Sequence, residues 1–455
     1  MRVPIQTPLP PSHIASEPPI EDSETVSLIV AKLLIPGRGE PIHNGALAIR
    51  GSKIDWIGSQ NNIPPKYQNI APRHVPVLMP GLWDCHVHFM GMDVIGGVLS
   101  LGGYLPGYNA LGGAITVDDL KVTLMAGYTS VRELGGGWGG DLWPAVQNGP
   151  LIGPNIYSAI APLSITGGHG DDHSTPIDTV MAAMNCGGNP IGVCDGVDDC
   201  IKTVRKMVRR GARCIKVCSS GGVGSLNDDP EDRQFSDEEL KAMVDEAARS
   251  RRAVAAHAIG KAGIMAALRA GVKSIEHGMY LDDEVADLML EKDAIYVPTQ
   301  HIVRILARDY SDQLPPPVKR KLLVVYDKAK DAYRLAIKRG VKVALGTDMT
   351  SSARTSALSH GNNAHELLYA VELGMTPLQA IESATANGPE TLGGMAPLSG
   401  QLKVGYDADI IAVAENPLDD IKVLTDTSNI THVWKGGKLF KSRPKMPSQT
   451  STYLF

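Results

Sequence analysis

Two histidines separated by one residue, His86 and His88, stand at the end of an apolar segment and could bind a metal ion. Side chains at positions i and i+2 of a strand point to the same face, so both imidazoles can reach one cation while Val87 packs on the other face. A pair of packed core histidines without a ligand is the alternative. Further ligands elsewhere in the chain must decide between the two interpretations.

Four more residues with donor side chains stand at or beside the ends of other apolar segments. They are Lys216, His257, His277 and Asp348, in that order along the chain. With the first pair they make four imidazoles, one carboxylate and one lysine, a donor set that suits zinc, with other divalent metals as alternatives. Glu276 precedes His277, so it is expected on the opposite face of that strand and is not counted as a ligand.

Lys216 does not suit a cation site as an ammonium. Two metal ions nearby disfavour the charged form, so the pKa of Lys216 should fall and the neutral amine become accessible. A neutral amine can take up carbon dioxide as a carbamate, whose two oxygens can bridge two metals. The alternative is a lysine whose ammonium simply extends from the strand end toward water.

The segments that carry these residues alternate between strand and helix patterns through residues 80–390. Capping signals open two of the helices, at Ser236 and at Thr376, and Gly271 ends another. Eight such units predict a (β/α)8 TIM-like barrel whose strand ends meet at one mouth, with the Gly-rich segments 91–113 and 164–198 as active-site loops. The expected strands are 75–78, 130–133, 156–159, 214–217, 253–257, 274–277, 295–297 and 343–347.

Both ends of the chain are rich in short strands and turns. Residues 25–79 and 391–445 are therefore predicted to form one β-sandwich domain, into which the barrel is inserted. Residues 1–24, rich in Pro and Ser, are predicted to be a flexible lead-in.

Composition excludes several classes of protein. The formal net charge of −5 gives no basis for binding nucleic acid or an anionic membrane, and no apolar run reaches the roughly 18 residues of a membrane span. The six cysteines are too few for a disulfide scaffold and include no Cys-x-x-Cys pair. These features favour a cytoplasmic protein, although secretion stays open because a leader could have been removed.

The order His-x-His, Lys, His, His, Asp resembles the amidohydrolase superfamily, of the type in which a carboxylated lysine bridges two metals. Within it, residues 77–86, 168–171, 260–267 and 431–440 are similar to the prolidase-like dipeptidases and, most closely, to the fungal ochratoxinase type. The resemblance implies two divalent ions, with zinc as the first candidate, and a homo-oligomer, with an octamer as one candidate form. It assigns the buried metal to His86, His88 and Asp348, the more exposed metal to His257 and His277, and the bridging carbamate to Lys216.

The same resemblance implies hydrolysis of a C–N amide bond in a small-molecule substrate by a hydroxide that bridges the metals. Asp348 would act as general base and then general acid, His169 would help to polarise the carbonyl, and Tyr280 would bind the substrate carboxylate or carbonyl oxygen. A role in loop structure is the alternative for His169, and a role outside the reaction is equally open for Tyr280.

The implied substrates are N-acyl amino acids and dipeptides with a free carboxylate and an apolar side chain, ochratoxin A included. One position departs from the ochratoxinase pattern, because Ile259 stands where that type has a second histidine after His257. The alternatives are a dipeptidase without ochratoxin activity and a catalytically silent scaffold, the latter disfavoured because the chain keeps all six ligand types.

Overall fold

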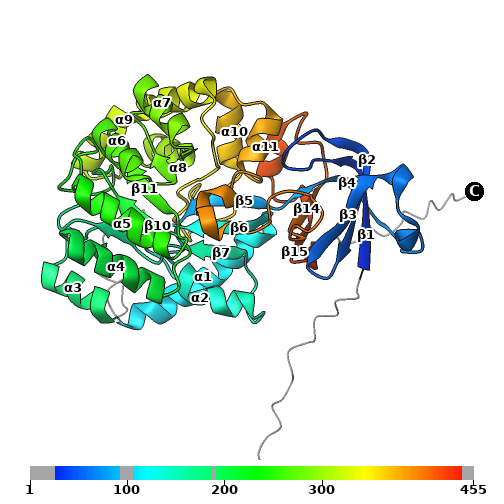
Figure 1. The fold of residues 1–455 in the computed structure, drawn as a ribbon, viewed down its shortest axis with the longest axis horizontal. Coiled ribbons are helices and arrows are strands. Elements are labelled where there is room, and N and C mark those ends of the chain that lie inside the picture. The colour runs from blue at the N-terminus through cyan, green and yellow to red at the C-terminus, as the bar shows by residue number, and fades with distance from the viewer. Residues whose placement is uncertain (1–25, 93–105, 187–190, 443–455) are drawn as a thin grey trace, which may run out of the picture.

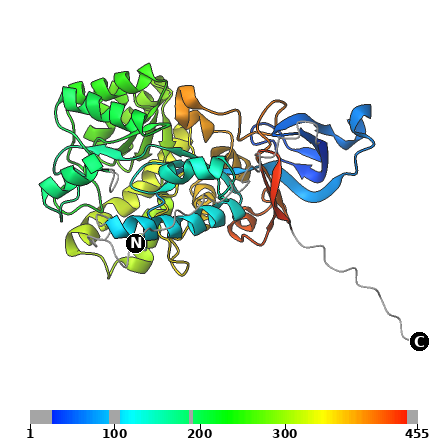
Figure 2. The ribbon, with the colours of Figure 1, turned by 90° about the horizontal axis from the view of Figure 1, so that it is seen from below.

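The computed structural model describes residues 26–92, 106–186 and 191–442, which form an α/β part and a β-sheet domain (Figure 1). In both views the sheet domain lies at one end of the molecule, beside the α/β part (Figure 2). The sheet domain contains strands from both ends of the chain, as predicted. Among the described residues, no helix has the length and apolar character needed to cross a bilayer.

The sheet domain is one hydrogen-bonded sheet of seven strands in the order β16-β15-β14-β4-β1-β2-β3. Among the strands that the structure describes in this sheet, only β1 and β4 pair in parallel; the other neighbours are antiparallel. Gly436 and Gly437 both have positive φ angles and form the tight turn between β15 and β16. The strands are β1 (Val26–Leu34), β2 (Ile42–Arg50), β3 (Lys53–Ser59), β4 (Arg73–Pro80), β14 (Ile410–Val413), β15 (Ile430–Lys435) and β16 (Lys438–Ser442).

The first predicted barrel strand, 75–78, was assigned to the wrong sheet. It lies within β4 and pairs with β1 and β14, whereas the first strand of the α/β part is β5 (Leu82–Val87). The chain passes from one sheet to the other at Gly81, where a Cβ would lie 2.1 Å from the hydroxyl oxygen of Thr129. The absence of a side chain at Gly81 therefore lets the backbone pass close to Thr129 as it changes sheet. The residue pattern alone does not distinguish this change of sheet from one continuous strand.

The strands of the α/β part are all parallel and fall into two sheets, β5-β6-β7 and β13-β12-β11-β10-β8-β9. The predicted fold class, parallel strands alternating with helices as in a TIM-like barrel, is confirmed. After β5 the strands are β6 (Tyr128–Glu133), β7 (Asn155–Ser158), β8 (Pro162–Ser164), β9 (Gly192–Val193), β10 (Ile215–Cys218), β11 (Val254–Ala258), β12 (Ser274–His277) and β13 (Ile295–Val297). The helices are α1 (Pro106–Met125), α2 (Gly139–Gln147), α3 (Ile177–Cys186), α4 (Val197–Arg209), α5 (Asp237–Arg249), α6 (Lys261–Ala270), α7 (Asp283–Glu291), α8 (Gln300–Ile305), α9 (Pro316–Arg339), α10 (His365–Glu372) and α11 (Pro377–Ser383).

Residues 342–349 fill the gap between β13 and β5 and join the two parallel sheets. On one side the backbone N–H of Tyr296 donates to the carbonyl oxygen of Lys342, and on the other the N–H of Cys85 donates to the carbonyl oxygen of Leu345, both at 2.8 Å. At the opposite junction, between β7 and β10, the N–H of Arg213 donates to the carbonyl oxygen of Ser158 at 2.8 Å. Backbone hydrogen bonds thus link the two parallel sheets at both junctions.

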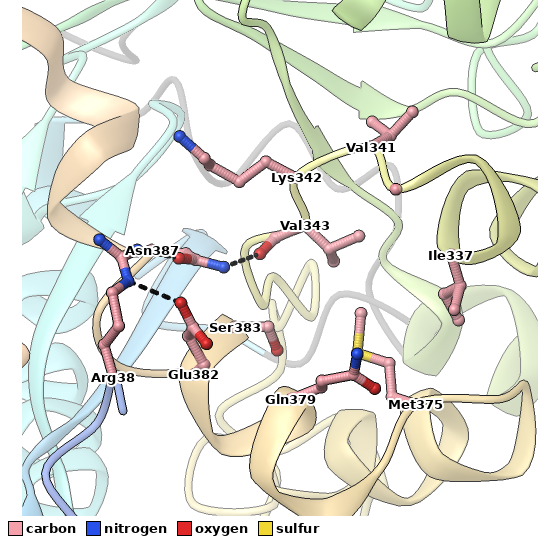
Figure 3. Close-up of a pocket in the computed structure, with 11 residues that line it drawn as sticks. Arg38, Ile337, Val341, Lys342, Val343, Met375, Gln379, Glu382, Ser383 and Asn387 are labelled. Atoms are coloured by element: carbon pink, nitrogen blue, oxygen red, sulfur yellow. Dashed lines mark hydrogen bonds and ion pairs between the residues drawn. The ribbon is translucent and has the colours of Figure 1, made fainter. Parts of the chain in front are cut away.

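The eighth predicted strand, 343–347, is irregular because the end of α11 takes part of its hydrogen bonding. The N–H of Leu345 donates to the carbonyl oxygen of Ser383 at 2.9 Å, and Asn387 Nδ2 donates to the carbonyl oxygen of Val343 at 2.8 Å (Figure 3). The segment therefore occupies the strand position without forming a continuous ladder.

The predicted helix boundaries are confirmed at the capping signals. Ser236 and Thr376 each form a complete capping box, and Gly271 takes the left-handed conformation after α6. The two predicted loops are shorter than expected, because α1 begins inside 91–113 and α3 lies inside 164–198; residues 93–105 and 187–190 lie outside the described residues. Gly112 lies within α1, where a Cβ would sit 2.5 Å from Trp138 Nε1, so this glycine reflects close packing and not a flexible loop.

Arg38, between β1 and β2, joins the sheet domain to α11 and the segment that follows it. Its guanidinium donates to Glu382 and Asn387 at 2.6 Å each and to Glu390 at 2.8 Å, beside a pocket of about 400 Å³ (Figure 3). Lys342 donates to the same Glu390 at 2.7 Å. These groups are partly exposed, so their main effect is to fix the relative orientation of the two parts.

A buried contact joins the two parts at a second place. Asp409, directly before β14, accepts hydrogen bonds from Asn155 Nδ2 at 2.8 Å and from the N–H of Gly436 at 2.6 Å. Burial raises the pKa of Asp409 to about 7, because these two donors only partly replace water around the charged form.

Candidate metal centre

The predicted donor side chains converge at the ends of the parallel strands. Ligand atoms of His86, His277 and Asp348 all lie within 4.8 Å of one another. His88 Nε2 lies 3.2 Å from Asp348 Oδ1, and Lys216 Nζ lies 3.5 Å from His86 Nε2. The tertiary structure thus places five of the donors around one point.

His257 completes the group on the side of β11. Its ring centroid lies 4.6 Å from that of His277 and 4.0 Å from that of His169, on which it stacks. His277 and Asp348 both have left-handed φ angles, +68° and +60°, which are uncommon for residues other than glycine. Such backbone strain is typical of functional positions and turns both side chains toward the centre.

Each imidazole has one nitrogen occupied by a neighbouring group. His86 Nδ1 lies 2.9 Å from Glu276 Oε2, and His277 Nδ1 lies 2.8 Å from Thr299 Oγ1. Both histidines therefore keep Nε2 for a ligand. Histidines that bind metals usually make such a second hydrogen bond, which fixes the orientation of the ring.

The other two imidazoles follow the same rule with different atoms. His88 Nδ1 lies 2.5 Å from the carbonyl oxygen of Gly135, so its Nε2 is available. His257 instead uses Nε2, which lies 3.1 Å from the carbonyl oxygen of Gly221, so its Nδ1 is available. The available nitrogens, one carboxylate and one lysine form a donor set that fits divalent metal ions.

Glu276 supports the centre in a way that the sequence did not indicate. Its carboxylate accepts from Arg132 Nη2 at 2.7 Å and from Ser274 Oγ at 2.5 Å, besides its contact with His86, and all of these groups are buried. The prediction that Glu276 faces away from the centre was wrong, because the left-handed φ of His277 breaks the alternation of the strand. Charged residues inside two predicted strands, Arg132 in 130–133 and Glu276 in 274–277, were the available signal.

Burial dominates the electrostatics of the centre. It lowers the pKa of Lys216, which favours the neutral amine that carboxylation requires. Burial likewise holds the pKa of His86 and His257 well below the usual value and lowers that of His277 to about 4. These imidazoles are therefore neutral at physiological pH, as metal ligands must be.

Asp348 is ionised in the same surroundings. Burial alone would raise its pKa, but positive charge on the nearby imidazoles, that of His86 first, outweighs burial and lowers the pKa; where those imidazoles are neutral, bound cations would supply the same stabilisation. A carboxylate that stays charged in a buried centre can bind a cation and accept a proton.

An apolar cavity of about 440 Å³ opens over the centre. Its polar side chains are His88, His169, His257, His277, Asp348 and Thr350. Most of the remaining wall is aliphatic. The α8–α9 region contributes Ile302, Val303, Leu306, Leu314, Val318 and Leu322, and other segments contribute Val223, Leu226, Ile259, Met279 and Leu358. This size and mixture are typical of a small-molecule site.

The structure treats the two predicted catalytic candidates differently. His169 lines the cavity beside His257, and burial lowers its pKa to about 4. Tyr280 is not among the described residues that line the cavity; its hydroxyl donates to Glu231 at 2.8 Å, and burial together with that carboxylate raises its pKa to about 12. Ile259 is buried and forms part of the apolar wall.

Comparison with known proteins agrees with this fold. A model of the amidohydrolase family matches residues 77–440. Ochratoxinase from Aspergillus niger is 46% identical over 431 residues, which are 92% of this chain and 88% of that protein. The chain therefore belongs to the amidohydrolase family.

Solved structures extend the comparison. The crystal structure of A. niger ochratoxinase has a TM-score of 0.83 and is matched over 93% of this chain and 97% of its own. A prolidase complexed with N-methylphosphonate-L-proline is 31% identical, with a TM-score of 0.82 and coverage of 92% and 100%. A Xaa-Pro dipeptidase with bound methionine, also 31% identical, has a TM-score of 0.80 over 92% of this chain and 100% of that one.

Proposed function

We propose that this protein hydrolyses the amide bond of N-acyl amino acids and dipeptide-like substrates that have a free carboxylate and an apolar side chain, ochratoxin A included. The convergence of six donor side chains below an apolar cavity carries the proposal. Similarity to an ochratoxinase and to prolidases supports the same reaction class.

Six side chains would hold two divalent ions, for which zinc is the best fit to the imidazole-rich donor set. His86, His88 and Asp348 would hold one ion, His257 and His277 would hold the other, and Lys216, once carboxylated, would supply oxygen ligands to both. Such ions supply Lewis-acid activation of water and of the scissile carbonyl.

The residues of the chain supply the proton transfers. Asp348, kept ionised among the imidazoles, accepts a proton from the attacking water and passes it to the amide nitrogen that leaves. His169, beside His257, contacts the substrate from the cavity wall. Tyr280 receives no role, because its hydroxyl is directed to Glu231.

The shape and polarity of the cavity support the proposed substrate class. Among the described residues, the polar side chains that line it, except for Thr350, belong to the centre or to His169, which favours binding of the scissile amide and the carboxylate at this end. The aliphatic wall then receives an apolar group such as the phenyl ring of a phenylalanine amide. We further propose that the protein is a homo-oligomer, which sedimentation velocity measurements would establish.

The test is release of phenylalanine from ochratoxin A, and of amino acids from a panel of dipeptides, by protein purified with zinc and bicarbonate. We expect release by the wild type and a loss of at least about 100-fold in Asp348→Asn, because a positioned acid–base group contributes that much or more. Asp331→Asn, an exposed carboxylate in α9, is the matched control and should retain full activity. Dipeptide hydrolysis without ochratoxin hydrolysis would restrict the proposal to a dipeptidase; no hydrolysis of either would refute it.

A further inference from the structure

A buried lysine contacts the loop that follows β10. Lys321, in α9, is only 4% exposed. Its Nζ donates to the carbonyl oxygens of Ser225 and Asp228, at 2.6 and 2.9 Å, and lies 3.4 Å from Asp228 Oδ1. An ammonium with three acceptors is fully satisfied, so Lys321 fixes the loop as a buried cation.

Asp228 receives hydrogen bonds on both carboxylate oxygens. The N–H of Gly222 and Gln234 Nε2 approach Oδ2, at 3.0 and 3.3 Å, and the hydroxyl of Ser225 approaches Oδ1. Burial opposes ionisation, but the Ser225 hydroxyl and nearby positive charge outweigh it and lower the pKa of Asp228. Asp228 is therefore an ionised group that can only accept.

This arrangement determines where the single proton of Ser225 lies. The Ser225 hydroxyl must donate to the Asp228 carboxylate, because the alternative acceptor, the carbonyl oxygen of Gly222, is 3.4 Å away. The lone pairs of Ser225 Oγ then face His169 Nδ1 at 2.9 Å. His169 must carry its hydrogen on Nδ1 to complete this contact.

The free edge of His169 faces the cavity. The ring lines the cavity and stacks on His257 with an interplanar angle of 17°. Nε2 has no hydrogen-bond partner among the described residues, so it is the atom that can meet a substrate. The orientation of the ring is thus set by the partner of Nδ1 and by the stack.

We propose that Ser225, Asp228 and Lys321 are positioning residues, which hold His169 in the Nδ1–H form and direct Nε2 at the substrate. The inference rests on the proposed amide-hydrolase function. The three residues act through His169 and touch neither substrate nor metal. Because the tautomer is set by a hydroxyl and a carboxylate outside the centre, substitutions there should change catalysis without changing metal content.

Ser225→Ala tests this with the smallest change of structure. We expect kcat/KM for the amide substrate to fall about tenfold while zinc content and thermal midpoint stay at wild-type values, because one hydrogen bond to the imidazole is lost. Ser225→Thr keeps the hydroxyl and should restore most of the activity. Asn227→Ala, an exposed residue of the same loop, is the matched control and should match the wild type.

A double-mutant cycle separates positioning from a general structural effect. Ser225→Ala should have no further effect in a His169→Ala background, since the group through which it acts is gone. An equal loss in both backgrounds, or equal activity of Ser225→Ala and wild type, would overturn the proposal. Lys321→Met should lower activity in the same non-additive way.

A second readout does not require activity. In zinc-loaded protein with 15N-labelled histidine, the His169 signals, assigned by their loss in His169→Gln, should show a protonated Nδ1 in the wild type and a changed tautomer in Ser225→Ala. Wild-type signals that show hydrogen only on Nε2, or signals that do not change in Ser225→Ala, would overturn the proposal. If no amide is hydrolysed, the proposed function fails while this measurement still decides the inference.

Discussion

Glu276→Gln should disable the metal centre although Glu276 is not one of the predicted ligands. The carboxylate places Oε1 against Arg132 and Ser274 and Oε2 against His86 Nδ1, all in buried surroundings. A glutamine has one oxygen. If that oxygen stays with Arg132, the new NH2 group faces His86 Nδ1, which must then give up its hydrogen. The hydrogen moves to Nε2, the atom that the metal needs.

Two separate magnitudes follow from this geometry. Loss of the carboxylate charge leaves Arg132 buried without its partner, which costs about 3–5 kcal/mol of unfolding free energy. Loss of the partner of a ligating histidine lowers metal affinity about 10–100-fold. The replacement Glu276→Met together with Arg132→Met removes both charges, so it should regain much of the stability but not the zinc affinity.

Two assays distinguish these effects. Zinc affinity is measured by titration with a competing chelator, and stability by thermal unfolding in excess EDTA, where metal binding makes no contribution. Glu284→Gln, an exposed carboxylate 2.6 Å from Lys261, should behave as wild type in both. If Glu276→Gln bound zinc with wild-type affinity and unfolded within about 1 kcal/mol of the wild type, the argument would be refuted.

Three further predictions concern packing, pH and metal. Gly346→Ala should destabilise the protein by about 1–3 kcal/mol and reduce its zinc content, because the new Cβ would lie 2.8 Å from the Cβ of His86. Gly113→Ala is the control: a Cβ at Gly113 would have no atom within 4 Å, so thermal unfolding should show a neutral or stabilising effect. The folded-state pKa of Asp409 is raised to about 7 from 3.8, so its contribution to stability is full below pH about 4 and is lost as the pH rises to about 7. The thermal midpoint of the wild type should therefore fall over this pH range relative to that of Asp409→Asn. Parallel curves of thermal midpoint against pH for the two proteins would contradict this. Removal of zinc by chelation should lower the thermal midpoint and restoration should recover it, because the ions bind the folded state; an unchanged midpoint would show that the donors hold no metal.

The position of each strand was predictable where the residue pattern was local. Buried strands such as β12 and β13 were predicted at their observed bounds, and the capping boxes at Ser236 and Thr376 were predicted from a few neighbouring residues. The assignment of 75–78 to the barrel was wrong, because which sheet a strand joins depends on partners far away in the sequence. The irregular hydrogen bonding of segment 342–349 also depends on distant partners, since α11 supplies part of it.

The sequence by itself determined the chemical types of the donors and their order along the chain. Donor type is a property of each residue, and parallel strands must bring their ends to one side, so His86, His88, Lys216, His257, His277 and Asp348 could be selected before any contact was known. Only the tertiary structure decided which ring nitrogen of each histidine is free. That choice depends on hydrogen-bond partners such as Glu276, Thr299 and Ser225, which lie between 22 and 190 residues from the histidines they contact and meet them only when the strands assemble.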